Sequence, residues 1–288
     1  MKEEYQMNEQ TKGVLLMAIS AVFFSIGGLC IKMIPWGPLS INGVRCIIGA
    51  AVFAFYLIWK KKKPVFNIPT LIGALGITAT TIFYNTATKF TTAGNAITLE
   101  YTSPIFIILM AYLFFKKKPQ KADIIAACVV FFGIFWFFLD SLSTGHFFGN
   151  MLGLCAAVSV SVIYVMKLHP KADVAYLIFY GLLMGAIVCL PSLATETEFS
   201  VEIWSYAISL GVFQQGIAYI LFFLGLSRCN PIPAVLASSL EPILNPIWVA
   251  IFYGEMISPI AMPGIIIVLA TVLIYNIYIE KQAAKTTA

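Results

Sequence analysis

Two acidic residues, Glu100 and Glu241, lie inside long apolar segments of this chain. A carboxylate in the hydrocarbon region of a membrane is unfavourable unless it is paired, protonated or hydrated, so such residues usually mark a substrate or proton site. We therefore expect both to bind substrate or to carry a proton. The alternative for Glu100 is a structural ion pair with Arg45, which is expected at a similar depth. The alternative for Glu241 is a neutral acid that bonds main-chain atoms freed by Pro242 and Pro246.

Further polar and aromatic residues in apolar segments would line a wet cavity together with these acids. Tyr101, beside Glu100, would present its ring to an organic cation, or else simply pack. Gln214 and Gln215 share a segment with Tyr219, which lies four residues after Gln215 on the same helix face. Hydrogen bonding between helices is the alternative role of these amides. The other candidates for substrate binding or proton coupling are Tyr84, Asn85 and Tyr164.

Other chemistries find no support in the sequence. The six cysteines form no CxxC pair, and His146 and His169 lie in predicted loops, so we expect no metal site. Walker, HExxH and GxSxG motifs are absent, which argues against ATP-driven transport and intramembrane hydrolysis. We expect neither an enzyme nor a cofactor. The net charge of +5 comes mainly from loop residues that membrane topology explains, so nucleic acid is not an expected partner.

The composition indicates which elements must position these residues. Hydrophobic residues make up 60% of the 288 positions and charged residues 11%, and the mean hydropathy is +0.91. A bilayer is the simplest environment for such a chain. We predict an all-α membrane protein with ten transmembrane helices, which we number as spans 1 to 10. They are placed at 13–34, 40–59, 68–88, 94–115, 122–140, 148–168, 174–194, 203–226, 233–253 and 258–279.

The distribution of Lys and Arg predicts the orientation of the spans. If residues 1–12 are cytoplasmic, all but three of the 18 basic residues lie in cytoplasmic loops and tails, as the positive-inside rule requires. The exceptions are Lys32, Arg45 and Lys89. Residues 280–288 would then form a second cytoplasmic tail. We expect a multi-pass protein of a bacterial cytoplasmic membrane, with the lipid bilayer as its surroundings.

Two stretches of the chain are similar to one another. Residues 96–115 and 234–253 align without a gap at an offset of 138, and Pro104 falls opposite Pro242. They occupy spans 4 and 9, the fourth of each set of five. We expect helix breaks near the midplane at both prolines and at Pro246, with simple shaping of packed helices as the alternative.

An odd number of spans per repeat reverses its direction in the membrane. The chain is therefore predicted to contain two inverted five-helix repeats, residues 13–140 and 148–279. Inverted repeats of this kind are common in secondary transporters, in which the substrate site lies between the halves.

Several stretches resemble the EamA-type carriers of the drug/metabolite transporter superfamily over essentially the whole chain. They are AVFFSIGGLCIKM in span 1, NGVRCIIGA with Arg45 in span 2, YNTATKFTTAGNAITLEYTSPIF across spans 3 and 4, and LGLSRCNPIPAVLASSLEPILNPIWVAIFYGE in the second half. Lys116 and Lys117 depart from the Gly-Glu pair that the family often has at this point. The resemblance implies ten helices, cytoplasmic termini and a cavity lined by spans 1, 3, 4, 6, 8 and 9. It also implies transport of small metabolites, often amino acid export.

The expected function is therefore secondary active transport of amino acids or related small metabolites by alternating access, with export as the expected direction. Protons are a candidate coupling ion for this transport. The carrier is expected to be a monomer or a homodimer. The alternatives are an organic-cation or drug carrier and an uptake carrier. The alternatives from other classes are a non-transporting sensor or assembly protein, which would explain the helices but not the inverted halves or the mid-span acids, and a membrane enzyme.

Overall fold

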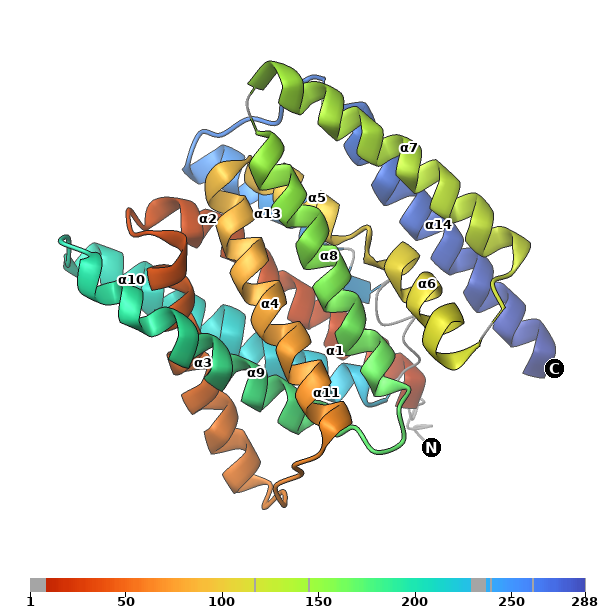
Figure 1. Ribbon diagram of the computed structural model, residues 1–288, viewed down its shortest axis with the longest axis horizontal. Coiled ribbons are helices and arrows are strands. Elements are labelled where there is room, and N and C mark those ends of the chain that lie inside the picture. The colour runs from red at the N-terminus through yellow and green to blue at the C-terminus, as the bar shows by residue number, and fades with distance from the viewer. Residues whose placement is uncertain are drawn as a thin grey trace, which may run out of the picture.

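The computed structural model describes residues 9–116, 118–144, 146–228, 237–238, 240–260 and 262–287, and every regular element in these ranges is a helix (Figure 1). The elements are α1 (Glu9–Ser25), α2 (Gly27–Met33), α3 (Pro38–Trp59), α4 (Ile68–Phe90), α5 (Ala93–Glu100), α6 (Ser103–Phe115), α7 (Lys121–Thr144), α8 (Phe147–Lys167), α9 (Val174–Cys189), the 3-10 helix η1 (Leu190–Thr195), α10 (Val201–Ser209), the π-helix η2 (Leu210–Ile217), α11 (Ala218–Leu226), α13 (Leu240–Phe252) and α14 (Met262–Thr287).

Among the described residues, seven continuous or nearly continuous helical segments have the length and hydropathy needed to cross a bilayer. They are Glu9–Met33, Pro38–Trp59, Ile68–Phe90, Ala93–Phe115, Phe147–Lys167, Val174–Thr195 and Val201–Leu226. Two further apolar helical stretches, Leu240–Phe252 and Met262–Tyr275, are shorter. These nine segments agree in position with predicted spans 1 to 4 and 6 to 10. The remaining span, span 5, corresponds to α7.

Local sequence explains where several helices begin. The side chains of Asn67, Thr92 and Asp173 each accept a hydrogen bond from the main-chain N–H three residues later, at 2.9, 3.1 and 3.0 Å, and so cap α4, α5 and α9. Pro38 occupies the first turn of α3, where its missing N–H has no helical partner to lose.

Span 4 is broken beside Pro104. α5 ends at Glu100, a turn follows, and α6 begins at Ser103 with the proline in its first turn. Pro242 likewise lies in the first turn of α13. No break occurs at Pro246, which differs from the prediction: α13 continues through it. A proline removes only one main-chain hydrogen bond, and packing of the neighbouring helices holds the rest of the helix together.

Helices distant in sequence pack closely. α4 lies against α8 and α9, α3 against α9 and η2, and α1 against α11, while α7 and α14 pair at one side of the bundle (Figure 1). Glycines permit the closest approaches: a Cβ on Gly49 would lie 2.5 Å from Cβ of Gln215, and one on Gly181 would lie 2.4 Å from Cβ of Ile77. Small residues at helix contacts are typical of membrane bundles.

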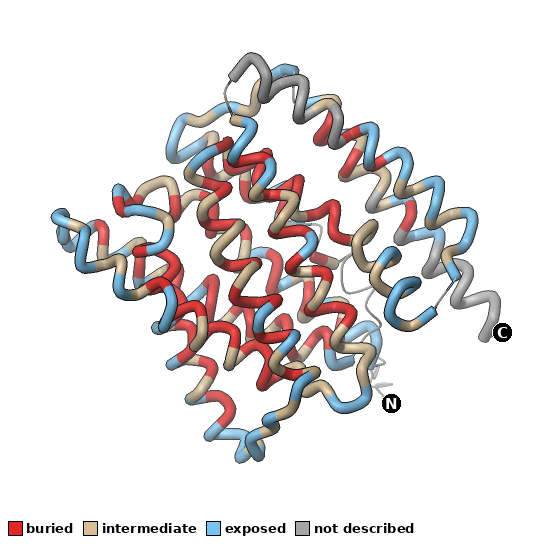
Figure 2. The backbone as a smooth tube through the Cα atoms, viewed as in Figure 1, coloured by how far each residue is buried: buried red, intermediate tan, exposed pale blue. Residues whose placement is uncertain are grey.

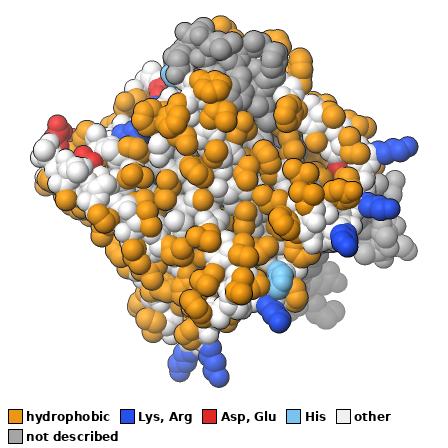
Figure 3. Space-filling model, viewed as in Figure 1, with side chains coloured by type: hydrophobic (Ala, Val, Ile, Leu, Met, Phe, Trp, Pro, Cys, Tyr) orange, Lys and Arg blue, Asp and Glu red, His pale blue; other side chains and the backbone are white. Residues whose placement is uncertain are grey.

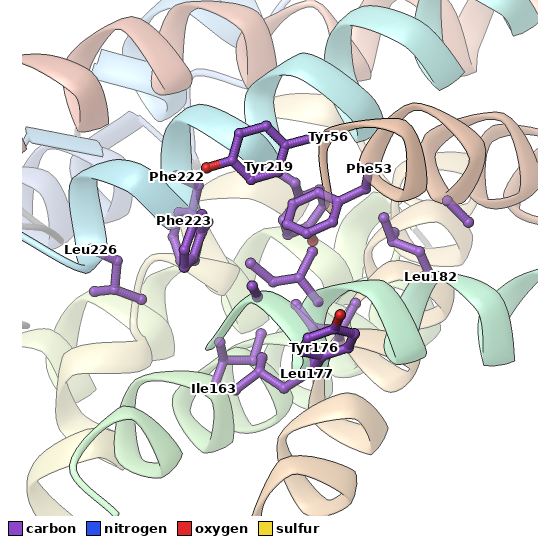
Figure 4. Packing of buried hydrophobic residues seen from close by; sticks show 14 of the residues in the cluster. Phe53, Tyr56, Ile163, Tyr176, Leu177, Leu182, Tyr219, Phe222, Phe223 and Leu226 are labelled. Atoms are coloured by element: carbon purple, nitrogen blue, oxygen red, sulfur yellow. The ribbon is translucent and has the colours of Figure 1, made fainter. Parts of the chain in front are cut away.

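The most extensive cluster of buried apolar residues joins α1, α3, α4, α8, α9 and α11. In Figure 4, Phe222 and Phe223 from α11 lie near Phe53 and Tyr56 of α3, and the Phe223 ring meets these two at centroid distances of 6.4 and 6.1 Å. Buried positions concentrate toward the middle of the bundle (Figure 2), whereas apolar side chains cover much of its visible outer face (Figure 3). That apolar exterior suits a lipid environment.

Candidate functional site

A cavity with a volume of about 70 Å³ lies among these helices. Both predicted acids line it, together with most of the other predicted site residues: Arg45, Tyr84, Glu100, Tyr101, Tyr164, Gln214, Gln215, Tyr219 and Glu241. The structure thus brings together residues from α3, α4, α8, α11, α13, η2 and the α5–α6 break. The six spans that the family resemblance implies all contribute to the cavity lining, and Arg45 contributes from span 2 as well.

Of the two cavity acids, Glu100 has fewer partners among the described residues. It is the last residue of α5 and is half-buried. In the described part of the chain, its carboxylate takes part in no hydrogen bond and no ion pair. Its oxygens therefore face the cavity, where a ligand or water can reach them.

Arg45 is almost completely buried, with 1% of its surface exposed. Its Nε donates to Asn42 Oδ1 at 3.1 Å, its Nη1 to Gln214 Oε1 at 3.3 Å and its Nη2 to the main-chain oxygen of Thr81 at 3.0 Å. All three acceptors are neutral, and the ion pair with Glu100, which the sequence offered as an alternative, is not formed among the described residues. The guanidinium still has N–H groups to offer because it carries five.

Glu241 lies in the first turn of α13 and meets Tyr101 from the other half of the chain. The Tyr101 hydroxyl is 3.1 Å from Glu241 Oε2 and also within hydrogen-bonding reach of the main-chain oxygen of Ser238. A hydroxyl has one proton to donate, so it serves one of these acceptors at a time. The expected alternative for Glu241, bonding to main chain freed by the prolines, is not seen among the described residues.

Tyr84 and Asn85 are adjacent in α4, but their side chains point in different directions and only Tyr84 lines the cavity. Tyr84 lines the cavity, and its hydroxyl accepts a hydrogen bond from Asn245 Nδ2 at 2.9 Å. Asn85 lies outside the cavity lining, and its Nδ2 donates to the main-chain oxygen of Pro38 instead. Successive residues of an α-helix point about 100° apart, which explains why only one of the two faces the cavity.

Aromatic rings from three helices form one wall. Phe24 of α1 meets Tyr219 edge-on at a centroid distance of 5.0 Å, and Phe222 lies 5.8 Å from Tyr164 and 6.0 Å from Tyr219. The two glutamines come from η2, and π-helical turns are frequent at functional sites.

Sequence reasoning missed several cavity-lining residues, namely Thr80, Thr81, Ser103, Val160, Ile163, Phe222 and Ser238, and did not commit to Phe24. Overlaying the two repeats would have found the serines. At the offset of 138, Glu100 falls opposite Ser238, and Ser103 falls opposite Glu241. Each half therefore supplies one acid and one serine to the cavity, at exchanged positions.

The described residues contain no group of three His, Cys, Asp or Glu side chains that could hold a metal ion. The cavity is instead suited to a charged or polar organic molecule, because it offers two carboxylates, a guanidinium, two amides and several aromatic rings.

Comparison with known proteins places the chain in a transporter family. The model of the EamA-like transporter family matches residues 11–139 and again 147–277. An uncharacterized transporter of Archaeoglobus fulgidus is 22% identical over 265 residues, covering 91% of this chain and 95% of its own. The threonine/homoserine exporter RhtA of Salmonella typhimurium is 24% identical over 272 residues, covering 89% of this chain and 88% of its own.

A protein of known crystal structure has a similar fold, with a TM-score of 0.67 at 16% identity over 93% of this chain and 98% of that one. Together with the helices long enough to span a bilayer, these matches describe an integral, multi-pass membrane protein. The chain belongs to the EamA-like transporter family.

Proposed function

We propose that this protein is a secondary carrier that exports amino acids or related small metabolites by alternating access between two inverted five-helix halves, residues 13–140 and 148–279. The observation that carries the proposal is the cavity itself. It holds the carboxylate of Glu100, which has no partner in the part of the chain that the structure describes, together with the carboxylate of Glu241 and a buried Arg45 whose acceptors there are all neutral.

Helix packing supports the inverted halves. If spans 1 to 5 are equivalent to spans 6 to 10, the principal contacts between the two halves should recur with their equivalents exchanged. The contact of α4 with α8 corresponds to that of α11 with α1, α4 with α9 to η2 with α3, and α5 and α6 with α8 to α13 with α1 and α2. The pairs α3–α9, α7–α14 and α5–α13 map onto themselves. All these contacts are present, as an approximate two-fold axis requires.

Backbone conformation gives separate support for the equivalence. Lys116 follows α6 with a φ of 52°, and Gly254 follows the end of α13 with a φ of 77°. They are 138 residues apart, and both adopt the left-handed conformation that commonly ends a helix.

The charges in the cavity suit a zwitterion. An ammonium group would bind Glu100 or Glu241, and a carboxylate would receive the remaining N–H groups of Arg45. The similarity to a threonine/homoserine exporter favours the same substrate class and the same direction. A proton on either acid would be the coupling ion, and the carrier would act as a monomer or homodimer.

Surface charge supports cytoplasmic termini. In Figure 3, most of the visible Lys and Arg side chains lie along the lower and right margin, and acidic side chains appear at the left. In Figure 1 the loop after α3 lies at the bottom of the molecule and the end of α14 lies at its right edge. This basic side would face the cytoplasm of a bacterial cell.

Counterflow in proteoliposomes tests the proposal. Vesicles loaded with threonine or homoserine should exchange it for labelled amino acid, and Glu100→Gln and Glu241→Gln should each abolish or strongly reduce this exchange. Glu202→Gln removes an exposed acid outside the cavity and should leave exchange intact. Absence of counterflow across a panel of amino acids, amines and nucleosides would contradict carrier function.

Organic-cation transport is the second candidate, because the cavity combines two carboxylates with an aromatic wall. The same vesicles separate the two. Exchange of quaternary amines but not amino acids would favour the cation carrier, and would leave Arg45 without a substrate carboxylate to bind.

A further inference from the structure

An ion pair joins the two halves at one end of the bundle. Lys32 Nζ, near the end of α2, lies 2.6 Å from Glu255 Oε2, which follows α13. Only 11% of the lysine side chain and 19% of the glutamate side chain are exposed. A pair so little exposed to water is screened less by salt than a surface pair.

The same two side chains also hold the junction between α4 and α5. Lys32 Nζ donates to the main-chain oxygen of Thr91 at 3.0 Å, and Glu255 Oε1 accepts from the main-chain N–H of Ala93 at 2.8 Å. Spans 1, 3, 4 and 9 are thereby fastened together at this end, and each of them lines the cavity.

We propose that Lys32 and Glu255 form an ionic latch that closes the cavity at the end of α2, and that the repeat provides no equivalent latch at the opposite end. The inference rests on the proposed function, since a latch acts only on a pathway that opens alternately at two ends. The end of α2 is the outer side in the predicted orientation.

The asymmetry follows from the repeat. At the offset of 138, Glu255 falls opposite Lys117, which lies outside the described residues, and the neighbouring Gly254 falls opposite Lys116. A lysine cannot supply the carboxylate that the equivalent pair would need. The resting carrier therefore opens at the end that carries Lys116, the cytoplasmic side in the predicted orientation.

Two ion pairs between different elements exist at the end opposite the latch, but they join different helices. Arg228 Nε lies 3.2 Å from Glu9 Oε2 and connects the residues after α11 to the start of α1, with side-chain exposures of 36% and 66%. Lys62 Nζ lies 3.6 Å from Asp173 Oδ2 and connects the loop after α3 to the start of α9. It does not tie span 4 to span 6, which would be the equivalent of the contact between spans 9 and 1. Its side chains are also more exposed, at 33% and 27%.

Cysteine accessibility tests the latch without requiring substrate. Ser103→Cys places a reporter cysteine in the cavity. Labelling of the parent protein, which has only its native cysteines, is subtracted to give the labelling of the reporter. A membrane-impermeant maleimide is applied to right-side-out and inside-out vesicles. We expect slow labelling from the side of Lys32 and faster labelling from the side of Lys116.

Breaking the ion pair should change only the rate of labelling from the side of Lys32. Lys32→Glu and Glu255→Lys, each in the reporter background, should raise labelling from the latched side roughly tenfold, the change produced by about 1.4 kcal/mol. The double exchange K32E/E255K restores opposite charges and should label more slowly than either single variant. Lys89→Gln is the matched control, because Lys89 lies at the same end but bonds the main-chain oxygen of Ile34 within the first half.

Two results would overturn the latch: single variants that label no faster than the parent, or a double exchange as fast as the faster single variant. Equal labelling of the parent from both sides would overturn the asymmetry. Counterflow distinguishes this failure from failure of the proposed function. A carrier without a latch still exchanges substrate, whereas a latched protein that is no carrier shows sided labelling but no exchange.

Discussion

The hydroxyl of Tyr101 lies 3.1 Å from Oε2 of Glu241, so a side chain of the first half contacts the cavity acid of the second. Tyr101 is buried, with 7% of its surface exposed, and forms part of the turn between α5 and α6. Any relative movement of spans 4 and 9 must therefore alter the surroundings of Glu241.

Tyr101→Phe removes this hydrogen bond and keeps the ring. A buried hydrogen bond contributes about 1 kcal/mol, so the half-saturation concentration for substrate should change roughly fivefold. The measurement is the concentration dependence of counterflow. Tyr112→Phe serves as the control, because Tyr112 is 47% exposed on α6 and does not line the cavity. Equal effects of the two variants would argue against a role for the Tyr101 contact.

Arg45→Lys keeps the charge but loses the planar group that bonds α3, α4 and η2 together. We expect the free energy of unfolding to fall by roughly 1–3 kcal/mol, seen as a lower midpoint of thermal unfolding in detergent. Counterflow of an amino acid should weaken more than that of the corresponding amine, which lacks the carboxylate. Arg228→Lys, at an exposed site, is the control. Equal weakening for acid and amine would exclude Arg45 as the carboxylate ligand.

Gly49→Ala should destabilise the bundle even though alanine favours helices. The new methyl group would lie 2.5 Å from Cβ of Gln215, so α3 and η2 would have to separate. Overpacking of this kind costs about 1–3 kcal/mol, which outweighs the helix preference of up to about 1 kcal/mol. Ala51→Val adds volume to the same helix at an exposed position and should be nearly neutral. Thermal unfolding measures both, and a stabilised Gly49→Ala variant would refute the close contact.

Asp173→Ala removes the cap of α9 and the ion pair with Lys62. The stability of the protein should fall by about 1 kcal/mol, because an unpaired main-chain N–H at a helix start is unfavourable. Asp173→Asn keeps the cap and loses only a partly exposed pair, so its unfolding midpoint should stay close to that of the parent. If the asparagine variant is as unstable as the alanine variant, the ion pair and not the cap is the important contact.

The sequence predicts much of the cavity because polar side chains in apolar spans are few. Glu100, Gln214 and Tyr219 stand out by type alone, and the structure places all three around one space. Their distances from one another are less predictable. Arg45 and Glu100 were expected at a similar depth, but the rotation of each helix about its own axis decides which side chains meet, and Arg45 meets neutral partners instead.

Helix breaks show the same limit. Two of the three prolines lie in the first turn of a helix, where a break is natural, whereas Pro246 continues within α13. The sequence identifies a residue that cannot donate a hydrogen bond, but the neighbouring helices decide whether the chain bends there. Asn245, just before this proline, donates a hydrogen bond to Tyr84 and is fully buried, which only the placement of α13 in the bundle reveals.

The π-helical turn from Leu210 to Ile217 determines the direction in which the side chains of α11, which follows it in span 8, point from the helix axis. If the same eight residues wound as an ordinary α-helix, each would turn the chain by about 100° instead of the smaller angle of a π-helix, and α11 would rotate relative to α10. Tyr219 and Phe222 would then swing out of the wall that they share with Phe24, while the residues before the turn stayed in place. The winding of this short segment is therefore as much a determinant of the cavity as the identity of the side chains that line it.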